Sequence, residues 1–204
     1  MILGITGAFG CGKSSVLAAF AARGWRTADA DSLCHGLYAE PGGAIARRFA
    51  ERWGVGILAS DGTVDRRRVG EIVFEKPEEL EFLTGLLYPE LSRKLEELID
   101  GCRKDGADGA YEIPLLYEAG YEGHFDRVVA VWAAPEIRRA RLREQRHFSD
   151  VEIRRREARQ LFADAKLERA EIALINNGDI RELELQVERL IEDWKAATSP
   201  RLDA

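Results

Sequence analysis

Short apolar runs alternate along this chain with stretches in which apolar residues follow a helical spacing. Five runs predict β-strands, and most end at turn-forming residues: residues 2–6, 25–29, 110–114, 128–133 and 172–175. Residues 13–22 place Val16, Leu17 and Phe20 on one stripe, which predicts an amphipathic helix, and apolar positions from 183 to 194 predict a final one. Strands that alternate with helices indicate βαβ units and a parallel sheet covered on both faces.

Two long segments fall outside this alternation. Residues 33–106 read as mostly helical, with a turn at Asp61-Gly62 and with Pro77 and Pro89 each expected in the first turn of a helix. Residues 136–169 read as helical and arginine-rich. We therefore expect one domain over 1–204: a core of about 1–32, 107–135 and 170–197, an acceptor-binding helical insertion at about 33–106 and a mobile lid at about 136–169.

Length and composition narrow the class of protein. A chain of 204 residues, 46% of them hydrophobic, is long enough to bury one substantial core. Its formal net charge of −6 argues against non-specific binding to nucleic acid, which needs a basic face. Cys11, Cys34 and Cys102 show no CxxC spacing, which argues against disulfides and structural zinc. No signal peptide or membrane span is expected, so we predict a cytoplasmic protein, monomeric or a weak homo-oligomer.

The strongest motif follows the first predicted strand. Residues 7–14, Gly-Ala-Phe-Gly-Cys-Gly-Lys-Ser, match the pattern GxxxxGK[ST]. Glycines let the backbone N–H groups of such a loop surround a phosphate, and the following helix N-terminus adds its dipole. Lys13 would lie between the β- and γ-phosphates of ATP, and Ser14 would bind Mg²⁺. The motif predicts an α/β P-loop NTPase fold of three layers, with a five-stranded parallel sheet, and Mg²⁺ with ATP as the cofactor.

Asp29-Ala30-Asp31 follows the second predicted strand. If the segment is extended, the two carboxylates point to the same side, where one can act as a general base or position magnesium. Alternatively, Asp31 only caps a helix that begins at Ser32. Beside a phosphate-binding loop, the catalytic interpretation is favoured.

Two further groups of side chains suit phosphoryl transfer. Most arginines of residues 138–159 are expected to be solvated and paired with acids, but one or two should close over the nucleotide, because this chemistry relies on cations around the migrating group. Glu112, near the end of the third strand, is either an acid of the magnesium shell or a surface carboxylate. His35, His124 and His147 are scattered and predict no metal site.

Together these residues resemble the dephospho-coenzyme A kinase family, whose members catalyse the last step of coenzyme A synthesis. The resemblance covers roughly residues 2–192, and its landmarks are Gly7–Ser15, Asp29–Asp31 with His35, Asp61-Gly62-Thr63 with Arg66, Pro89, Ile113–Glu118, Arg141, Ser149, Gln160, Lys166 and Asn176.

The resemblance implies ATP-dependent phosphorylation of the ribose 3′-hydroxyl of dephospho-coenzyme A. ATP would bind to Gly7, Gly10, Cys11, Gly12, Lys13, Ser14, Ser15 and Asn176. The acceptor would contact Asp29, Asp31, His35, Leu115 and Glu118, with Asp31 as the base. Arg138, Arg141 and Arg146 would belong to the lid, with Arg141 near the transferred phosphate.

The chain departs from the family pattern at several positions. Tyr88 stands where the family has a histidine before the proline, and Gln145 stands where a second lid arginine is expected. Either Arg146 or Arg143 would then supply the missing charge. Two other functions remain open: a different P-loop small-molecule kinase, acting on a nucleoside monophosphate or a sugar, and a nucleotide switch without enzymatic activity.

Overall fold

The computed structural model describes residues 1–198, except for the side chains of residues 74, 75 and 198. The chain forms two compact units, one made of residues 1–28 and the chain from Cys102 onward, the other of Asp29–Gly101. The helices of the expected lid belong to the first unit. No helix of the described part is long and apolar enough to cross a membrane.

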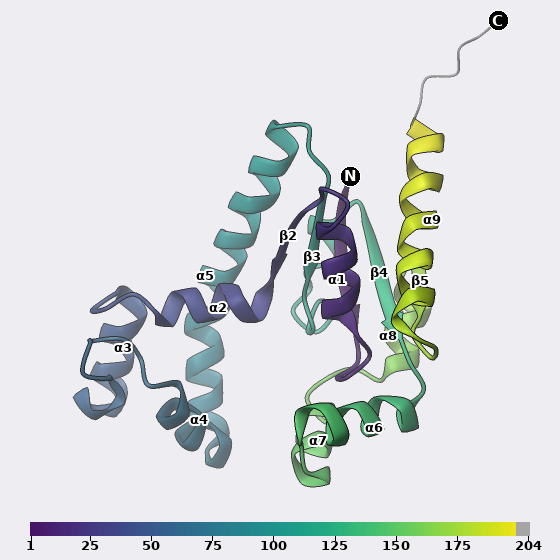
Figure 1. Ribbon diagram of the computed structural model, residues 1–204. Helices are drawn as coiled ribbons and strands as arrows, with labels where there is room; N and C mark the ends of the chain where they lie inside the picture. Colours follow the sequence, from purple (N-terminus) through teal and green to yellow (C-terminus); the bar gives the residue numbers. More distant parts are fainter. Residues whose placement is uncertain (199–204) are drawn as a thin grey trace, which may run out of the picture. The chain divides into compact units, whose positions relative to one another are not determined.

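The first unit is built on a five-stranded sheet (Figure 1). Its strands lie in the order β2-β3-β1-β4-β5, with β1 at Ile2–Gly7, β2 at Arg26–Asp29, β3 at Gly109–Glu112, β4 at Arg127–Trp132 and β5 at Ile172–Ile175. The strand pairs β1–β3, β1–β4 and β4–β5 are parallel. The expected α/β class and the five-stranded parallel sheet are confirmed. All six residues of β1 are buried, as its apolar run predicts for a central strand.

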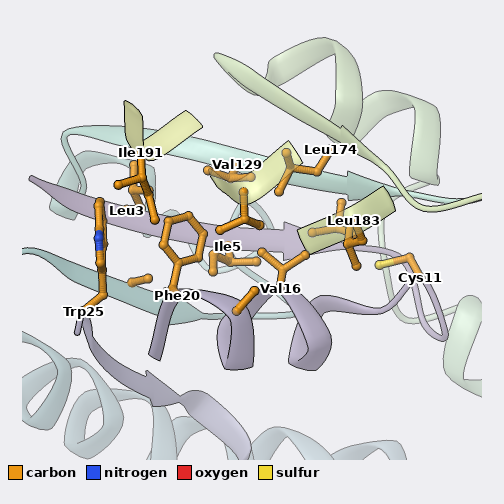
Figure 2. Packing of buried hydrophobic residues seen from close by; sticks show 14 of the residues in the cluster. Leu3, Ile5, Cys11, Val16, Phe20, Trp25, Val129, Leu174, Leu183 and Ile191 are labelled. Atoms are coloured by element: carbon orange, nitrogen blue, oxygen red, sulfur yellow. The ribbon is translucent and has the colours of Figure 1, made fainter. Parts of the chain in front are cut away.

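Helices α1 (Lys13–Ala21) and α9 (Ile180–Thr198) cover one face of this sheet. Phe20 of α1, Leu183 of α9 and Ile5 of β1 meet in one buried cluster, shown in Figure 2. Helix α8 (Ala163–Arg169) packs on β1 and β4. The remaining elements of this unit are η2 (Glu122–His124), α6 (Pro135–Arg146) and α7 (Asp150–Glu157).

The second unit is helical, as expected for residues 33–106. It contains α2 (Ala30–Tyr38), α3 (Ala44–Trp53), η1 (Val55–Ile57), α4 (Arg66–Glu75) and most of α5 (Pro77–Lys104). Phe49 is fully buried at its core, with its ring centroid 4.8 Å from that of Trp53. Pro77 begins α5 as expected, but the expectation for Pro89 was wrong, because this proline lies inside α5. A long apolar stripe evidently outweighs the loss of one backbone hydrogen bond.

Gly4 shows how closely the other sheet face is packed. A Cβ atom on Gly4 would lie 2.5 Å from Cδ2 of Phe125 and 2.7 Å from Cδ1 of Leu116. Since both neighbours are buried, neither can move aside freely. A glycine in the middle of β1 is thus a packing requirement.

We expect Gly4→Ala to destabilise the protein by about 1–3 kcal/mol, the usual cost of overpacking a core. Gly123→Ala is the matched control, because a Cβ there meets nothing within 4 Å. Urea denaturation followed by circular dichroism measures both free energies of unfolding. Equal stability of the two variants would show that Phe125 and Leu116 yield to the extra methyl group.

Candidate functional site

A glycine-rich loop joins the carboxyl end of β1 to the N-terminus of α1. Gly7, Gly10 and Gly12 have φ angles of 147°, 81° and 96°. Residues with a Cβ atom rarely adopt such positive values. Space is equally restrictive at Gly12, where a Cβ would lie 2.1 Å from Nδ2 of Asn176. The predicted loop therefore needs its glycines for both conformation and close approach.

Backbone donors of this loop are available for an anion. Among residues 1–198, the N–H groups of Gly10 and Gly12 donate to no other group of the protein. Ser15 and Val16 donate to the Gly12 carbonyl, so α1 begins directly behind the loop. The N–H groups at the very start of a helix precede its first hydrogen bond, and together with the helix dipole they attract a phosphate.

Lys13 and Glu112 lie side by side at this edge of the sheet. The Lys13 Nζ atom lies 4.0 Å from Oε1 of Glu112 and donates to the Ala8 carbonyl at 3.3 Å. Both side chains are nearly buried, 8% and 11% exposed. The location of Glu112 beside the loop lysine favours its interpretation as an acid of the nucleotide site over that of a surface carboxylate.

Asn176 directly follows β5, and its side chain contacts the glycine-rich loop. Its Nδ2 atom donates to the Cys11 carbonyl at 2.8 Å. Arg141 of α6 in turn donates to the Asn176 backbone carbonyl at 2.9 Å and to the Gly178 carbonyl at 3.1 Å. Arg141 thus lies at the end of β5, connected to the loop through Asn176.

The other predicted lid arginines differ in their surroundings. Arg138 is buried and donates to the Phe9 carbonyl, while Arg143 donates to Asp150 at 2.7 Å. Arg146 is exposed, and no hydrogen bond or ion pair of its side chain occurs within the described residues. Of the two candidates to replace the arginine expected at position 145, Arg146 is therefore the one without a protein partner.

Cys11 contributes its backbone to the loop and its side chain to the core. The thiol is fully buried in the cluster of Figure 2. Burial raises the pKa of this thiol, against the opposing effect of the Lys13 charge. A buried, protonated thiol is unreactive, which agrees with its interpretation as an ordinary loop residue.

Asp29 and Asp31 belong to the second unit and have separate roles. Helix α2 begins at Ala30, not at Ser32, and its N-cap is Asp29, whose carboxylate accepts from Ser32 N at 2.7 Å. The segment is therefore not extended through Asp31, and the alternative interpretation of Asp31 as the cap is wrong. The cap lies two residues earlier because Asp29 already has the β conformation that a cap needs.

The Asp31 carboxylate is consequently not used by the helix end. It is exposed, and the carboxylate forms no hydrogen bond or ion pair in the described part of the chain. His35, exposed as well, follows four residues later on the same face of α2. Burial raises the pKa of the neighbouring Cys34 thiol to about 11, and the negative charges of Asp31 and Asp29 add to this effect.

Glu118, predicted to contact the acceptor, forms an ion pair with Lys166 of α8. Its Oε1 atom lies 2.8 Å from the Lys166 Nζ and accepts from Leu161 N at 2.7 Å. Lys166 is fully buried and also donates to the Pro114 carbonyl. Burial lowers the pKa of this ammonium group, and the hydrogen bond that it donates to Glu118 opposes that shift. Leu115 lies in the same loop and is half-buried.

The structure thus brings together most of the predicted nucleotide residues at the carboxyl ends of β1, β3 and β5, where parallel sheets bind ligands. Asp29, Asp31 and His35 lie in the other unit. Sequence reasoning noted Lys166 but assigned it no role. Its place among the family landmarks was a signal, but no local pattern indicated that the side chain is buried or which acid pairs with it.

Three comparisons with known proteins agree. The sequence model of the family described as dephospho-CoA kinase matches residues 1–182. Dephospho-CoA kinases from Enterococcus faecalis and Thermosynechococcus vestitus are 34% and 39% identical, covering 94% and 92% of this chain and 96% and 91% of theirs. The crystal structure of TT1252 from Thermus thermophilus is similar with a TM-score of 0.78 and 32% identity, over 98% of both chains.

We expect Lys166→Met to lower the free energy of unfolding by roughly 2–5 kcal/mol, because it leaves the Glu118 carboxylate without its buried partner. Adding Glu118→Gln should recover much of the loss. Arg181→Met is the control, since its ion pair with Glu184 is largely exposed and should contribute little. Chemical denaturation of the four variants measures the coupling. Additive effects of Lys166→Met and Glu118→Gln would contradict it.

Proposed function

The chain belongs to the dephospho-CoA kinase family, and we propose that it transfers the γ-phosphoryl group of ATP to the ribose 3′-hydroxyl of dephospho-CoA. That reaction yields coenzyme A and ADP and completes coenzyme A biosynthesis. The observation that carries the proposal is the loop of residues 7–13, whose unpaired N–H groups and buried lysine suit a nucleotide phosphate, in a chain that matches the family over 182 residues.

Each reacting group has a candidate in this chain. The Asp31 carboxylate takes the proton of the 3′-hydroxyl while the hydroxyl oxygen forms a bond to the γ-phosphorus. The bond between the γ-phosphorus and the β–γ bridging oxygen breaks, and ADP leaves. Lys13 and the loop N–H groups stabilise the charge that develops on the phosphates. Arg141 supplies a further cation near the nucleotide, held by the Asn176 and Gly178 carbonyls.

The oxygen ligands of the site fit Mg²⁺. Ser14 is exposed at the start of α1, and the Glu112 carboxylate lies 4.0 Å from the Lys13 ammonium group. Mg²⁺ prefers few protein oxygens together with water and phosphate. Ser14 would hold it directly and Glu112 through water, and the ion would neutralise phosphate charge. Among the described residues, no cluster of three or more His, Cys, Asp or Glu side chains suits a metal ion.

Acceptor contacts are proposed for Asp31 and His35, which share one exposed face of α2, and for Leu115. The Asp29 and Glu118 carboxylates accept hydrogen bonds from Ser32 N and Leu161 N. Their proposed contribution to acceptor binding is mainly to fix these two backbone segments. We also propose a cytoplasmic location and a monomer or weak homo-oligomer. The three free cysteines suit a reducing compartment.

An acceptor panel separates this proposal from the other functions. ATP consumption is measured with dephospho-CoA, AMP, gluconate and shikimate. Turnover only with dephospho-CoA supports the proposal, and faster turnover with another acceptor would replace it. ATP binding without turnover of any acceptor would favour a nucleotide switch.

We expect Lys13→Ala to fold and to lose transferase activity by a factor of roughly a hundred or more, because a preorganised charge on the phosphates is lost. Lys104→Ala, which removes an exposed lysine of the same unit, is the control. Steady-state kinetics and circular dichroism on both variants are the measurements. A folded Lys13→Ala enzyme with normal turnover would remove the loop from the active site.

Asp31→Asn tests the acceptor side. Because Asp29 already caps α2, this change leaves the helix end intact and removes only a charge and a proton acceptor. Turnover should fall by roughly a hundredfold or more, the usual scale for losing a general base, with ATP affinity unchanged. Asp100→Asn, at an exposed position of α5, is the control. Unchanged turnover of Asp31→Asn would assign the 3′-hydroxyl to another base.

A further inference from the structure

Arg138 of α6 contacts the glycine-rich loop, and its buried guanidinium group donates three hydrogen bonds within the protein. Its Nη1 atom donates to the Phe9 carbonyl at 3.0 Å and to Glu157 Oε1 at 2.8 Å, and its Nε atom donates to the Ala133 carbonyl at 3.2 Å. The residue is only 6% exposed. Such an arginine, paired with a carboxylate, differs from the solvated lid arginine expected at this position.

The contact with Phe9 determines how one peptide group of the loop is oriented. In a planar trans peptide, the carbonyl of one residue and the N–H of the next point in opposite directions. The Phe9 carbonyl points toward Arg138, so the Gly10 N–H points away from α6, and it has no acceptor within the described residues. Asn176 does the same from the other side by holding the Cys11 carbonyl, which turns the Gly12 N–H away from it.

Packing around the same peptide reinforces this orientation. A Cβ on Gly10 would lie 2.8 Å from Cγ of Leu142, so α6 touches the backbone of the loop. The Phe9 ring packs edge-on against Phe148, with centroids 5.3 Å apart, and the Arg156 guanidinium lies 5.2 Å from its centroid. The loop is thereby held from α6, α7 and the turn between them.

We propose that Arg138 is a positioning residue of the phosphate-binding loop, which it keeps in its anion-binding geometry by holding the Phe9 carbonyl. The proposal rests on the proposed function, in which this loop binds ATP. If Arg138 has this role, α6 and α7 stabilise the loop in addition to their proposed role as a lid. Glu157 accepts from both Arg138 and Arg139, so a shared carboxylate offsets the charge of Arg138, whose main contribution to the site is hydrogen-bond geometry.

The test compares Arg138→Gln, Arg138→Lys and the double variant Arg138→Gln/Glu157→Gln with the wild type. ADP and ATP affinities are measured by calorimetry, and kcat and KM for dephospho-CoA by steady-state assay. The double variant also removes the Glu157 carboxylate, which Arg138→Gln would leave partly buried and paired with the exposed Arg139 alone, at 3.3 Å. The comparison therefore does not depend on that remaining charge. Arg155→Gln, at an exposed position of α7, is the control.

We expect Arg138→Gln and the double variant to bind ADP and ATP about tenfold more weakly, the scale of one charge-assisted hydrogen bond. Arg138→Lys should recover part of the affinity, and KM for dephospho-CoA should stay the same. A hundredfold fall in kcat with normal ADP affinity would instead make Arg138 a ligand of the migrating phosphoryl group. A lower melting temperature with normal ADP affinity would leave it a purely structural residue. Either result overturns the proposal, whereas a wild-type protein that binds no ATP would overturn the proposed function itself.

Discussion

The site depends on one constraint of backbone geometry: a loop that offers its N–H groups to an anion must place its carbonyls elsewhere. In this protein the carbonyls of Ala8, Phe9 and Cys11 accept from Lys13, Arg138 and Asn176. Each donor comes from a different element, α1, α6 or the end of β5. Since trans peptides orient both groups together, satisfying the carbonyls also directs the donors.

This arrangement explains why buried charge gathers at one edge of the sheet. Lys13 lies beside Glu112, Arg138 beside Glu157, and Lys166 beside Glu118. A buried cation without a partner would be costly, so each is paired with a carboxylate. Only the Lys13–Glu112 pair is wide, at 4.0 Å, which leaves the lysine able to interact with a phosphate. The other two pairs are closer, at 2.8 Å, and hold backbone segments in place.

The two carboxylates of Asp29-Ala30-Asp31 illustrate a different division of work. The Asp29 side chain caps the N-terminus of α2, whereas Asp31, in the first turn, has an exposed carboxylate. Position along one helix therefore decides which of two chemically identical groups is structural and which is available for an acceptor. Asp31 and Lys13 belong to different compact units.

The order of elements, the parallel sheet and the glycine-rich loop were determined by the sequence itself, because apolar periodicity and the spacing of glycines are local properties. The family resemblance rested on the same local motifs. Tertiary structure decided what those patterns do not encode: that Pro89 lies inside α5 and that Glu118 pairs with Lys166. The direction of Arg138 toward Phe9 belongs to this second group as well. The physical reason is that the partner of a buried charge is chosen by packing between residues far apart in the chain, such as Arg138 and Phe9, and no local pattern records that choice.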